Sequence, residues 1–163
     1  MLPLLTRIDH VGIACRDLRK TIDLYRTTFG LGMMTMEVNE EQGVREAILA
    51  VGSEVPVPGA AGTGYVQLLE PLGPDTPVGK FLARRGEGIH HVGYAVADIK
   101  AALAAIGGGG VRLIDERPRH GTMGASIAFL HPADVGGVLT ELVQVRHLSA
   151  MPHTDTNGIY QDG

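Results

Sequence analysis

An eleven-residue motif occurs twice in this sequence. Residues 8–18 read IDHVGIACRDL and residues 89–99 read IHHVGYAVADI, an offset of 81 positions. In both copies apolar and polar residues alternate as in a β-strand, and an aspartate follows (Asp17, Asp98) that can cap a helix. The repeat predicts that the 163-residue chain is built from two copies of one small module.

Each module is predicted to be β-α-β-β-β. The first helix is expected to bury one stripe of residues and to end at Gly30; the stripe is Leu18, Ile22, Tyr25 and Phe29. The second helix has the equivalent stripe Ile99, Ala102, Leu103 and Ile106, and is expected to end in the glycines of 107–110. Strands are expected at 31–39, 43–51 and 64–70 in the first module, and at 111–116, 124–131 and 138–145 in the second.

The expected fold class is α+β, with paired βαβββ modules whose sheets lie side by side and enclose a cleft. We expect a single domain over residues 1–163: module one at about 7–70, a linker helix at about 75–86 and module two at about 88–145. Residues 52–63 are expected to form a Gly/Pro/Ala loop, and residues 147–163 a mobile tail.

Composition excludes several classes of protein. A net charge of -4 and a pI of about 5.9 give no basic surface for nucleic acid. No apolar run is long enough to span a membrane, and the N-terminus does not have the pattern of a signal peptide. Cys15 is the single cysteine and is expected to be a buried thiol, so a cytoplasmic location is predicted.

Two histidines occupy the same position in the two motifs. Strand alternation places His10 on one face with Ile8 and Gly12, and the repeat gives His91 the same phase. Aligning the last strands of the modules places Gln67 opposite Glu141. Each module is therefore expected to contribute one imidazole and one amide or carboxylate side chain to the cleft.

Two imidazoles, one carboxylate and one amide oxygen form a suitable ligand set for a divalent metal, with two of six octahedral positions left open. We therefore predict a metal site formed by His10, Gln67, His91 and Glu141. His90 has the opposite strand phase and is the weaker candidate. The remaining histidines have no repeat partner and are expected at loops or on the surface: His120, His131, His147 and His153.

A further carboxylate occurs where the repeat predicts an apolar residue. Glu46 aligns with Ile127 of the second module. Either Glu46 escapes to solvent at a twisted sheet edge, or it points into the cleft beside the metal, where it can act as a base. In the second case Glu46 and Glu141 would flank one substrate carbon, which suits removal of a proton from one face and its return to the other.

The sequence resembles the vicinal oxygen chelate superfamily, of glyoxalase-like fold, and within it the methylmalonyl-CoA epimerase family. The resemblance covers about residues 7–145 and is most specific in EEQGVRE (40–46) and EPLGPDTPVGKFL (70–82). It implies that His10, Gln67, His91 and Glu141 bind the metal and that Glu46 and Glu141 are the catalytic bases.

The resemblance also implies an activity, a cofactor and partners. The expected reaction is epimerisation of (2R)- and (2S)-methylmalonyl-CoA through an enolate. The expected cofactor is a divalent metal ion, with Co²⁺ preferred over Mn²⁺, Zn²⁺, Ni²⁺ or Mg²⁺. The expected partners are the small-molecule substrate and a second copy of the chain in a homodimer, with no nucleic acid and no membrane. Five cations are available for the CoA phosphates without any being assigned: Lys80, Arg84, Arg85, Arg117 and Arg119.

Other functions remain open on the same fold. A glyoxalase-like isomerase acting on a hemithioacetal would be expected to carry two carboxylate ligands, where this chain has Gln67 and Glu141. An extradiol dioxygenase needs only a His/His/Glu set, so Gln67 would be surplus. A ligand-sequestering protein of this fold would generally lack the full metal set.

Overall fold

The computed structural model describes residues 3–52 and 64–145. The loop and the tail predicted above therefore lie outside the described residues, apart from position 52. The first module consists of β1 (Leu5–Ala14), α1 (Leu18–Phe29), β2 (Gly32–Asn39), β3 (Val44–Val51) and β4 (Gly64–Pro71). Helix α2 (Pro77–Arg85) follows, and the second module consists of β5 (Gly88–Val96), α3 (Ile99–Gly108), β6 (Arg119–His120), η1 (Thr122–Gly124), β7 (Ser126–Leu130), η2 (Pro132–Asp134) and β8 (Thr140–Gln144).

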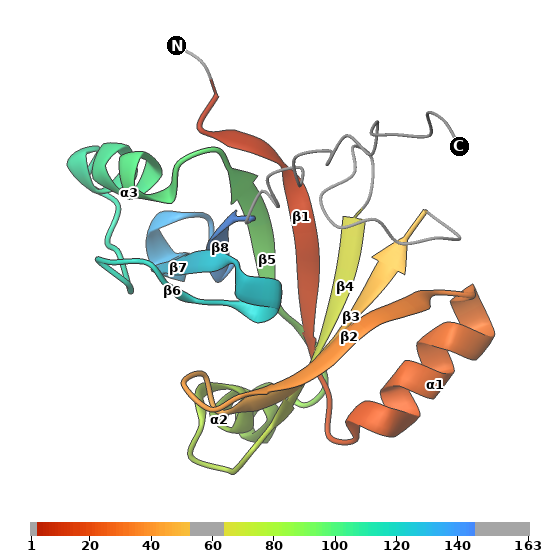
Figure 1. The fold of residues 1–163 in the computed structure, drawn as a ribbon. Helices are drawn as coiled ribbons and strands as arrows, with labels where there is room; N and C mark the ends of the chain where they lie inside the picture. The colour runs from red at the N-terminus through yellow and green to blue at the C-terminus, as the bar shows by residue number, and fades with distance from the viewer. Residues whose placement is uncertain (1–2, 53–63, 146–163) are drawn as a thin grey trace, which may run out of the picture.

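The strands form one eight-stranded sheet in the order β2-β3-β4-β1-β5-β8-β7-β6 (Figure 1). The two motif strands, β1 and β5, run antiparallel at its centre, and each pairs in parallel with the last strand of its own module. The modules thus join through the repeated motif itself. The predicted α+β fold of paired βαβββ modules is confirmed.

The register of the sheet confirms the alignment of the two last strands. Gln67 lies opposite Gly12 in the β1–β4 pair, and Glu141 lies opposite Gly93 in the β5–β8 pair. Because Gly12 and Gly93 occupy the same place in the motif, Gln67 and Glu141 occupy equivalent positions. The alignment assumes a longer loop before the last strand of module one, and the backbone pairing of the two strands agrees with it.

The three helices begin and end close to the predicted positions. Asp17 and Asp98 accept backbone N–H groups at the starts of α1 and α3, and Gly30 ends α1 in a left-handed conformation with φ 70°. Helix α1 buries Leu18 against β3 and β4, and α3 packs against β7 and β8. Phe29 was expected on the buried stripe, but it lies at the last turn of the helix and is 62% exposed.

The strand predicted at 111–116 is wrong. Within the described residues this segment makes only an isolated bridge, from Leu113 to Leu130, and regular pairing resumes in the two-residue β6. The backbone N–H groups of Ile114 and Asp115 both donate to the Phe129 carbonyl, which is an irregular pairing, and Pro118 lacks an N–H. These features prevent a continuous ladder along β7.

Simple alternation also fails near the start of β1. The pairing of β1 with β5 shifts between Ile8 and His10, so Ile8 does not share the face of His10. Ile8 is 61% exposed, whereas Asp9 and His10 are both buried. The shift brings Asp9 beside His10, a contact that strict alternation excludes.

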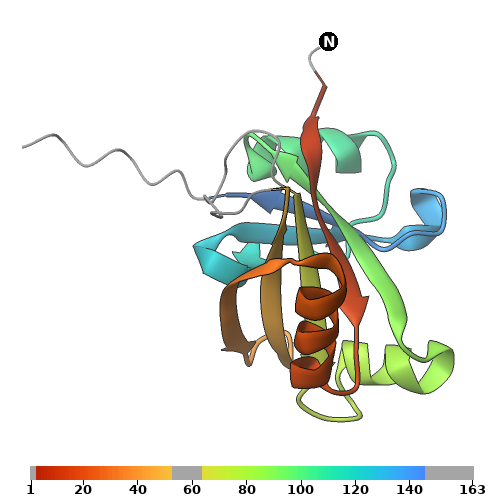
Figure 2. The ribbon, with the colours of Figure 1, turned by 90° about the vertical axis from the view of Figure 1, so that its right-hand side faces the viewer.

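No helix of the described residues lies across the middle of the outer face of the β1–β5 pair, although Ile13 at one end packs against the cluster under α1. Figure 2 shows β1 and β5 running between α1 and α3 with neither helix lying across them. The register places Ile8 opposite Tyr94 and Ile13 opposite Ile89, and Ile89 is 64% exposed.

None of the helices described is long and apolar enough to cross a membrane.

Candidate metal centre and active site

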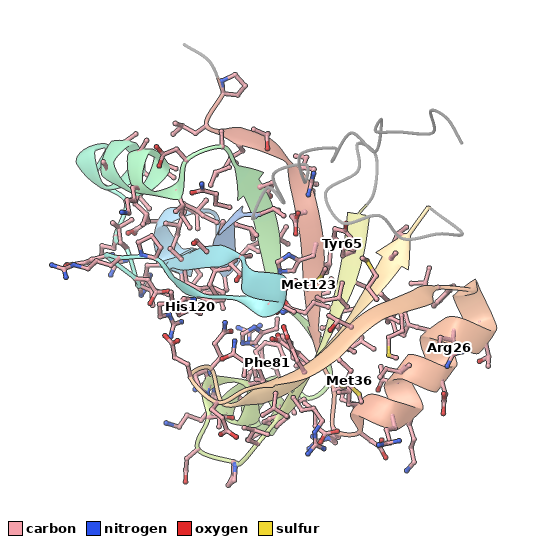
Figure 3. All side chains as sticks on the ribbon, viewed as in Figure 1. Arg26, Met36, Tyr65, Phe81, His120 and Met123 are labelled. Carbon is pink, nitrogen blue, oxygen red and sulfur yellow. The ribbon has the colours of Figure 1, made fainter. Side chains whose placement is uncertain are left out.

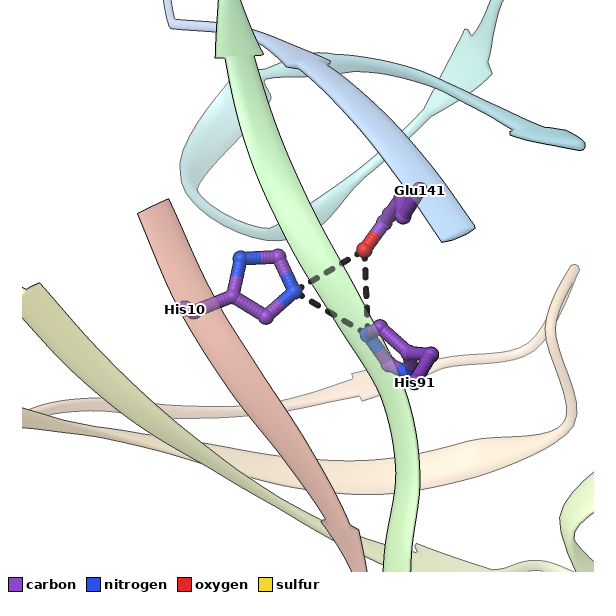
Figure 4. Close-up of side chains that lie close together, drawn as sticks. All are labelled: His10, His91 and Glu141. Atoms are coloured by element: carbon purple, nitrogen blue, oxygen red, sulfur yellow. Dashed lines mark hydrogen bonds and ion pairs between the residues drawn. The ribbon is translucent and has the colours of Figure 1, made fainter. Parts of the chain in front are cut away.

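Three ligand atoms converge at the centre of the sheet (Figure 4). The Nε2 atoms of His10 and His91 lie 3.0 Å apart, and Glu141 Oε2 lies 2.9 Å from His10 Nε2 and 3.1 Å from His91 Nε2. The three residues come from β1, β5 and β8 and are all buried. They form a candidate metal site with one carboxylate and two imidazole ligands.

The spacing of these atoms matches an octahedral ion. Adjacent ligands at about 2.1 Å from a metal are separated by about 3.0 Å in an octahedron and by about 3.4 Å in a tetrahedron. The observed separations of 2.9–3.1 Å fit three neighbouring octahedral positions.

Gln67 supplies a suitable fourth ligand atom. Its Nε2 donates to Glu46 Oε2 at 2.7 Å and to Thr122 Oγ1 at 3.2 Å. Its Oε1 is buried and has no hydrogen-bond partner among the described residues. A buried carbonyl oxygen without a partner is uncommon in a native protein. The donor set of two imidazoles, a carboxylate and an amide oxygen therefore fits a divalent cation.

The glycines of the motif make room for the histidines. The His91 ring lies over Gly12, and the His10 ring lies over Gly93; a Cβ built on either glycine would be 2.2 Å from the Cε1 atom of that ring. Each copy of HVG therefore supplies one imidazole and the space for the imidazole of the other copy. This reciprocal packing explains why the same tripeptide occurs in both central strands.

Asp9 holds the His10 ring in place. His10 Nδ1 lies 3.1 Å from Asp9 Oδ1, and Arg7 donates to Asp9 Oδ2 at 2.6 Å. Burial alone would lower the pKa of His10, but its contacts with Asp9 and Glu141 raise it to about 9. A carboxylate that accepts the Nδ1 proton leaves the Nε2 lone pair free for a metal, as is usual for histidine ligands.

His90 occupies the same place beside His91. The Nδ1 atoms of the two rings lie 3.0 Å apart, and the His90 ring packs edge-on against Phe81 of α2. Burial, together with the nearby His91 ring, lowers the pKa of His90 to about 4. A neutral His90 can accept the Nδ1 proton of His91, so the residue preceding each histidine in the motif orients it. Strand phase alone gave no indication of either contact.

We expect Asp9→Ala to weaken metal binding. Loss of the carboxylate frees the His10 ring to rotate and to place its proton on Nε2, so the dissociation constant for Co²⁺ should rise by about 10- to 100-fold. Competition with a chromogenic chelator measures the change, with Asp23→Ala on the exposed side of α1 as the control. An unchanged affinity in Asp9→Ala would contradict the orienting role of Asp9.

Glu46 does not escape to solvent: its side chain is 0% exposed. Its Oε2 accepts a hydrogen bond from Gln67, and the Thr122 hydroxyl lies near the carboxylate, while its Oε1 has no hydrogen-bond partner among the described residues. Burial raises the pKa of Glu46 above that of an exposed glutamate. A raised pKa suits a group that must accept and release a proton near neutral pH.

A cavity of about 250 Å³ opens beside these residues. Its walls include His10, Gln67 and Glu141, together with Thr122 and Met123 of η1 and Tyr65 of β4. Tyr65 and Met123 are labelled in Figure 3. Thr122 could not be found from the sequence, because η1 has no counterpart in the repeat. Of the described arginines and lysines only Arg7 lines the cavity, so the five cations considered for CoA stay unassigned.

The fold is that of a known superfamily. A family model described as the glyoxalase/bleomycin resistance protein/dioxygenase superfamily matches residues 9–129. That match covers more than half of the chain, so the chain belongs to this superfamily.

Several relatives narrow the assignment. A solved methylmalonyl-CoA epimerase in complex with methylmalonyl-CoA and NH4+ is 51% identical, with a TM-score of 0.81 over 88% of this chain and 96% of that one. The epimerase of Mycobacterium tuberculosis is 40% identical, with a TM-score of 0.79 over 90% and 92% of the two chains. An ethylmalonyl-CoA/methylmalonyl-CoA epimerase of Cereibacter sphaeroides is 33% identical over 85% of this chain and 98% of its own. Within the superfamily, the chain is a member of the methylmalonyl-CoA epimerase family.

Proposed function

We propose that this protein interconverts (2R)- and (2S)-methylmalonyl-CoA by removing the C2 proton from one face and returning a proton to the other. The observation that carries the proposal is a cluster of two buried carboxylates at one cavity: Gln67 and Glu141 line the cavity, and Glu46 is buried beside Gln67, whose amide donates to it. A relative that is 51% identical to this chain was solved with methylmalonyl-CoA bound.

The proposed roles follow from the contacts of each side chain. His10, His91, Glu141 and Gln67 hold the metal, and the Gln67 amide also fixes the orientation of Glu46. Glu46, with a raised pKa and an unpartnered Oε1, exchanges a proton with C2. Glu141 serves the opposite face as the second base. A divalent cation, when bound, stabilises negative charge that develops on the thioester oxygen.

We propose Co²⁺ as the bound ion, with Mn²⁺, Zn²⁺, Ni²⁺ and Mg²⁺ as weaker alternatives. Support comes from the mixed nitrogen and oxygen ligands, which suit a divalent ion of the first transition series. Metal analysis of the purified protein, followed by reactivation of stripped protein with each ion, tests this choice.

Exchange of the C2 hydrogen tests the function itself. In D₂O, metal-replete protein is expected to incorporate deuterium at C2 of methylmalonyl-CoA, because a proton removed by a glutamate exchanges with solvent before it is returned. Mass spectrometry of the product measures the incorporation. Metal-stripped protein is the control and should show little exchange. If metal-replete protein produced no exchange, the epimerase proposal would be wrong, and hemithioacetal substrates would be tested next.

We also propose that the protein is a homodimer formed through the outer face of the β1–β5 pair. Ile8 and Ile89 are 61% and 64% exposed there and lie near opposite ends of the strand pair. Because β1 and β5 are related by the internal repeat, two copies can pack these faces against each other with matching contacts. The exposed isoleucines would then be buried.

Replacing Ile89 by glutamate should therefore convert the dimer to a monomer. A charge at this position would be buried in the interface without a partner, which is strongly unfavourable. Light scattering after gel filtration measures the mass, and Leu24→Glu, at an exposed position of α1, is the matched control. A monomeric wild-type protein would contradict the proposal.

The cytoplasm is the proposed location. Cys15 is the single cysteine, it is 2% exposed, and burial raises the pKa of its thiol to about 11. A chain that needs no disulfide and keeps an unreactive thiol is suited to a reducing compartment. Fractionation of cells that express the protein tests the location.

A further inference from the structure

A second contact connects the two modules beside the cavity, at a solvent-exposed position. Glu37 on β2 lies directly opposite Glu46 on β3 in the antiparallel ladder, so the two side chains share one face of the sheet. Two carboxylates facing each other across strands are unfavourable, and Glu37 adds to the effect of burial in raising the pKa of Glu46. The repulsion between Glu37 and Glu46 suggests that Glu37 has another role that compensates for it.

Glu37 makes one specific contact, and it reaches the other module. Its Oε1 accepts the backbone N–H of Met123 at 3.0 Å, although the two residues are 86 positions apart. Met123 is the one non-glycine residue of the described chain with a left-handed backbone, at φ 57° and ψ 29°. Such a conformation costs free energy in a methionine, so it persists where surrounding contacts hold it.

The turn that Glu37 holds carries Thr122. The Thr122 hydroxyl lies beside the Glu46 carboxylate and accepts the Gln67 amide at 3.2 Å, and the same Gln67 Nε2 donates to Glu46 at 2.7 Å. The turn therefore supplies one of the contacts that orient Glu46. Glu46 itself lies on β3, so its orientation depends on a residue from the opposite module.

We propose that Glu37 is a positioning residue: its carboxylate anchors the η1 turn, so that Thr122 holds Glu46 in the orientation that exchanges protons with substrate. The inference rests on the proposed function for its effect on rate, whereas the anchoring of the turn is independent of it. Glu37 does not contact the metal ligands in this scheme; its anchoring role acts through Met123 and Thr122, apart from the effect of its charge on the pKa of Glu46.

The experiment compares Glu37→Ala with Glu37→Gln. Alanine removes the acceptor, so kcat is expected to fall by about 10- to 100-fold with little change in KM. Backbone amides of residues 122–125 are expected to exchange with deuterium faster. Glutamine keeps an oxygen at the same place and is expected to retain most of both properties. Glu40→Ala, an exposed position on the same hairpin, is the control and should behave as wild type.

Two further results can overturn the proposal. Wild-type kcat and amide exchange in Glu37→Ala would do so, and so would a glutamine variant as impaired as the alanine variant, because the role would then belong to the charge. In a Thr122→Val background, Glu37→Ala should cause little additional loss of kcat, whereas full additivity would show that Glu37 does not act through Thr122. Amide exchange reports on the anchor without substrate, so it remains informative even if the epimerase activity is absent.

Discussion

Replacing Glu46 by glutamine is expected to lower kcat by about 10²- to 10⁴-fold, the range typical for loss of a general base. Glutamine has nearly the same shape and keeps an oxygen that can accept the hydrogen bond from Gln67. The glutamine amide cannot remove the proton from C2. The defect should therefore appear in kcat and in C2 deuterium exchange, while the bound metal stays near one ion per chain.

The control for this variant is Glu40→Gln, the same change at an exposed position of the adjoining turn. Its kcat should equal that of wild type. Full activity in Glu46→Gln would mean that the burial and raised pKa of Glu46 serve only to position Gln67. A loss of metal together with activity would instead assign Glu46 to support of the metal site.

Most of the fold could be predicted because the repeat converts weak local signals into paired ones. The equivalence of Gln67 and Glu141 follows from comparing two strands, and each is found opposite a motif glycine. Helix limits at Asp17 and Gly30 depend on capping groups that lie within a few residues of the helix. Local chemistry of this kind is fully present in the sequence.

The errors arose where the backbone departs from a regular ladder. The shift between Ile8 and His10 changes which side chains face inward, and it brings Asp9 to the metal site. No residue pattern in the motif predicts this shift in strand pairing. The irregular segment before β6 is a similar case, because its backbone bonds depend on Phe129, which is distant in sequence.

The contacts of Glu37 could be predicted only in part. Its pairing with Glu46 could have been derived from the hairpin, since both residues flank one turn at matching distances. Its contact with Met123 could not, because η1 belongs to the second module and has no equivalent in the first. The repeat thus predicts what the modules share, and the structure is needed for what only one of them contains.

Glu141→Gln is expected to weaken metal binding strongly and to lower activity, and this combination separates it from Glu46→Gln. Burial alone would raise the pKa of Glu141, but hydrogen bonds from the His10 and His91 rings lower it to about 2. This residue therefore supplies the one negative charge of the ligand set. A neutral amide would leave the ion with two imidazoles and two amide oxygens. The metal dissociation constant should rise by more than about 100-fold, beyond what loss of an orienting residue causes.

Excess metal decides whether Glu141 has a second role. If Glu141 were only a ligand, saturating Co²⁺ would restore kcat to the Glu141→Gln variant. If it is also the base for one face of C2, activity stays low at full metal occupancy, since the substituted amide cannot transfer the proton. Metal analysis and epimerisation rate, measured on the same saturated samples, distinguish the two cases, with Glu116→Gln at an exposed site as the control. We expect the second result, because epimerisation needs a proton donor on each face and the described cluster offers only Glu46 and Glu141 as buried glutamates.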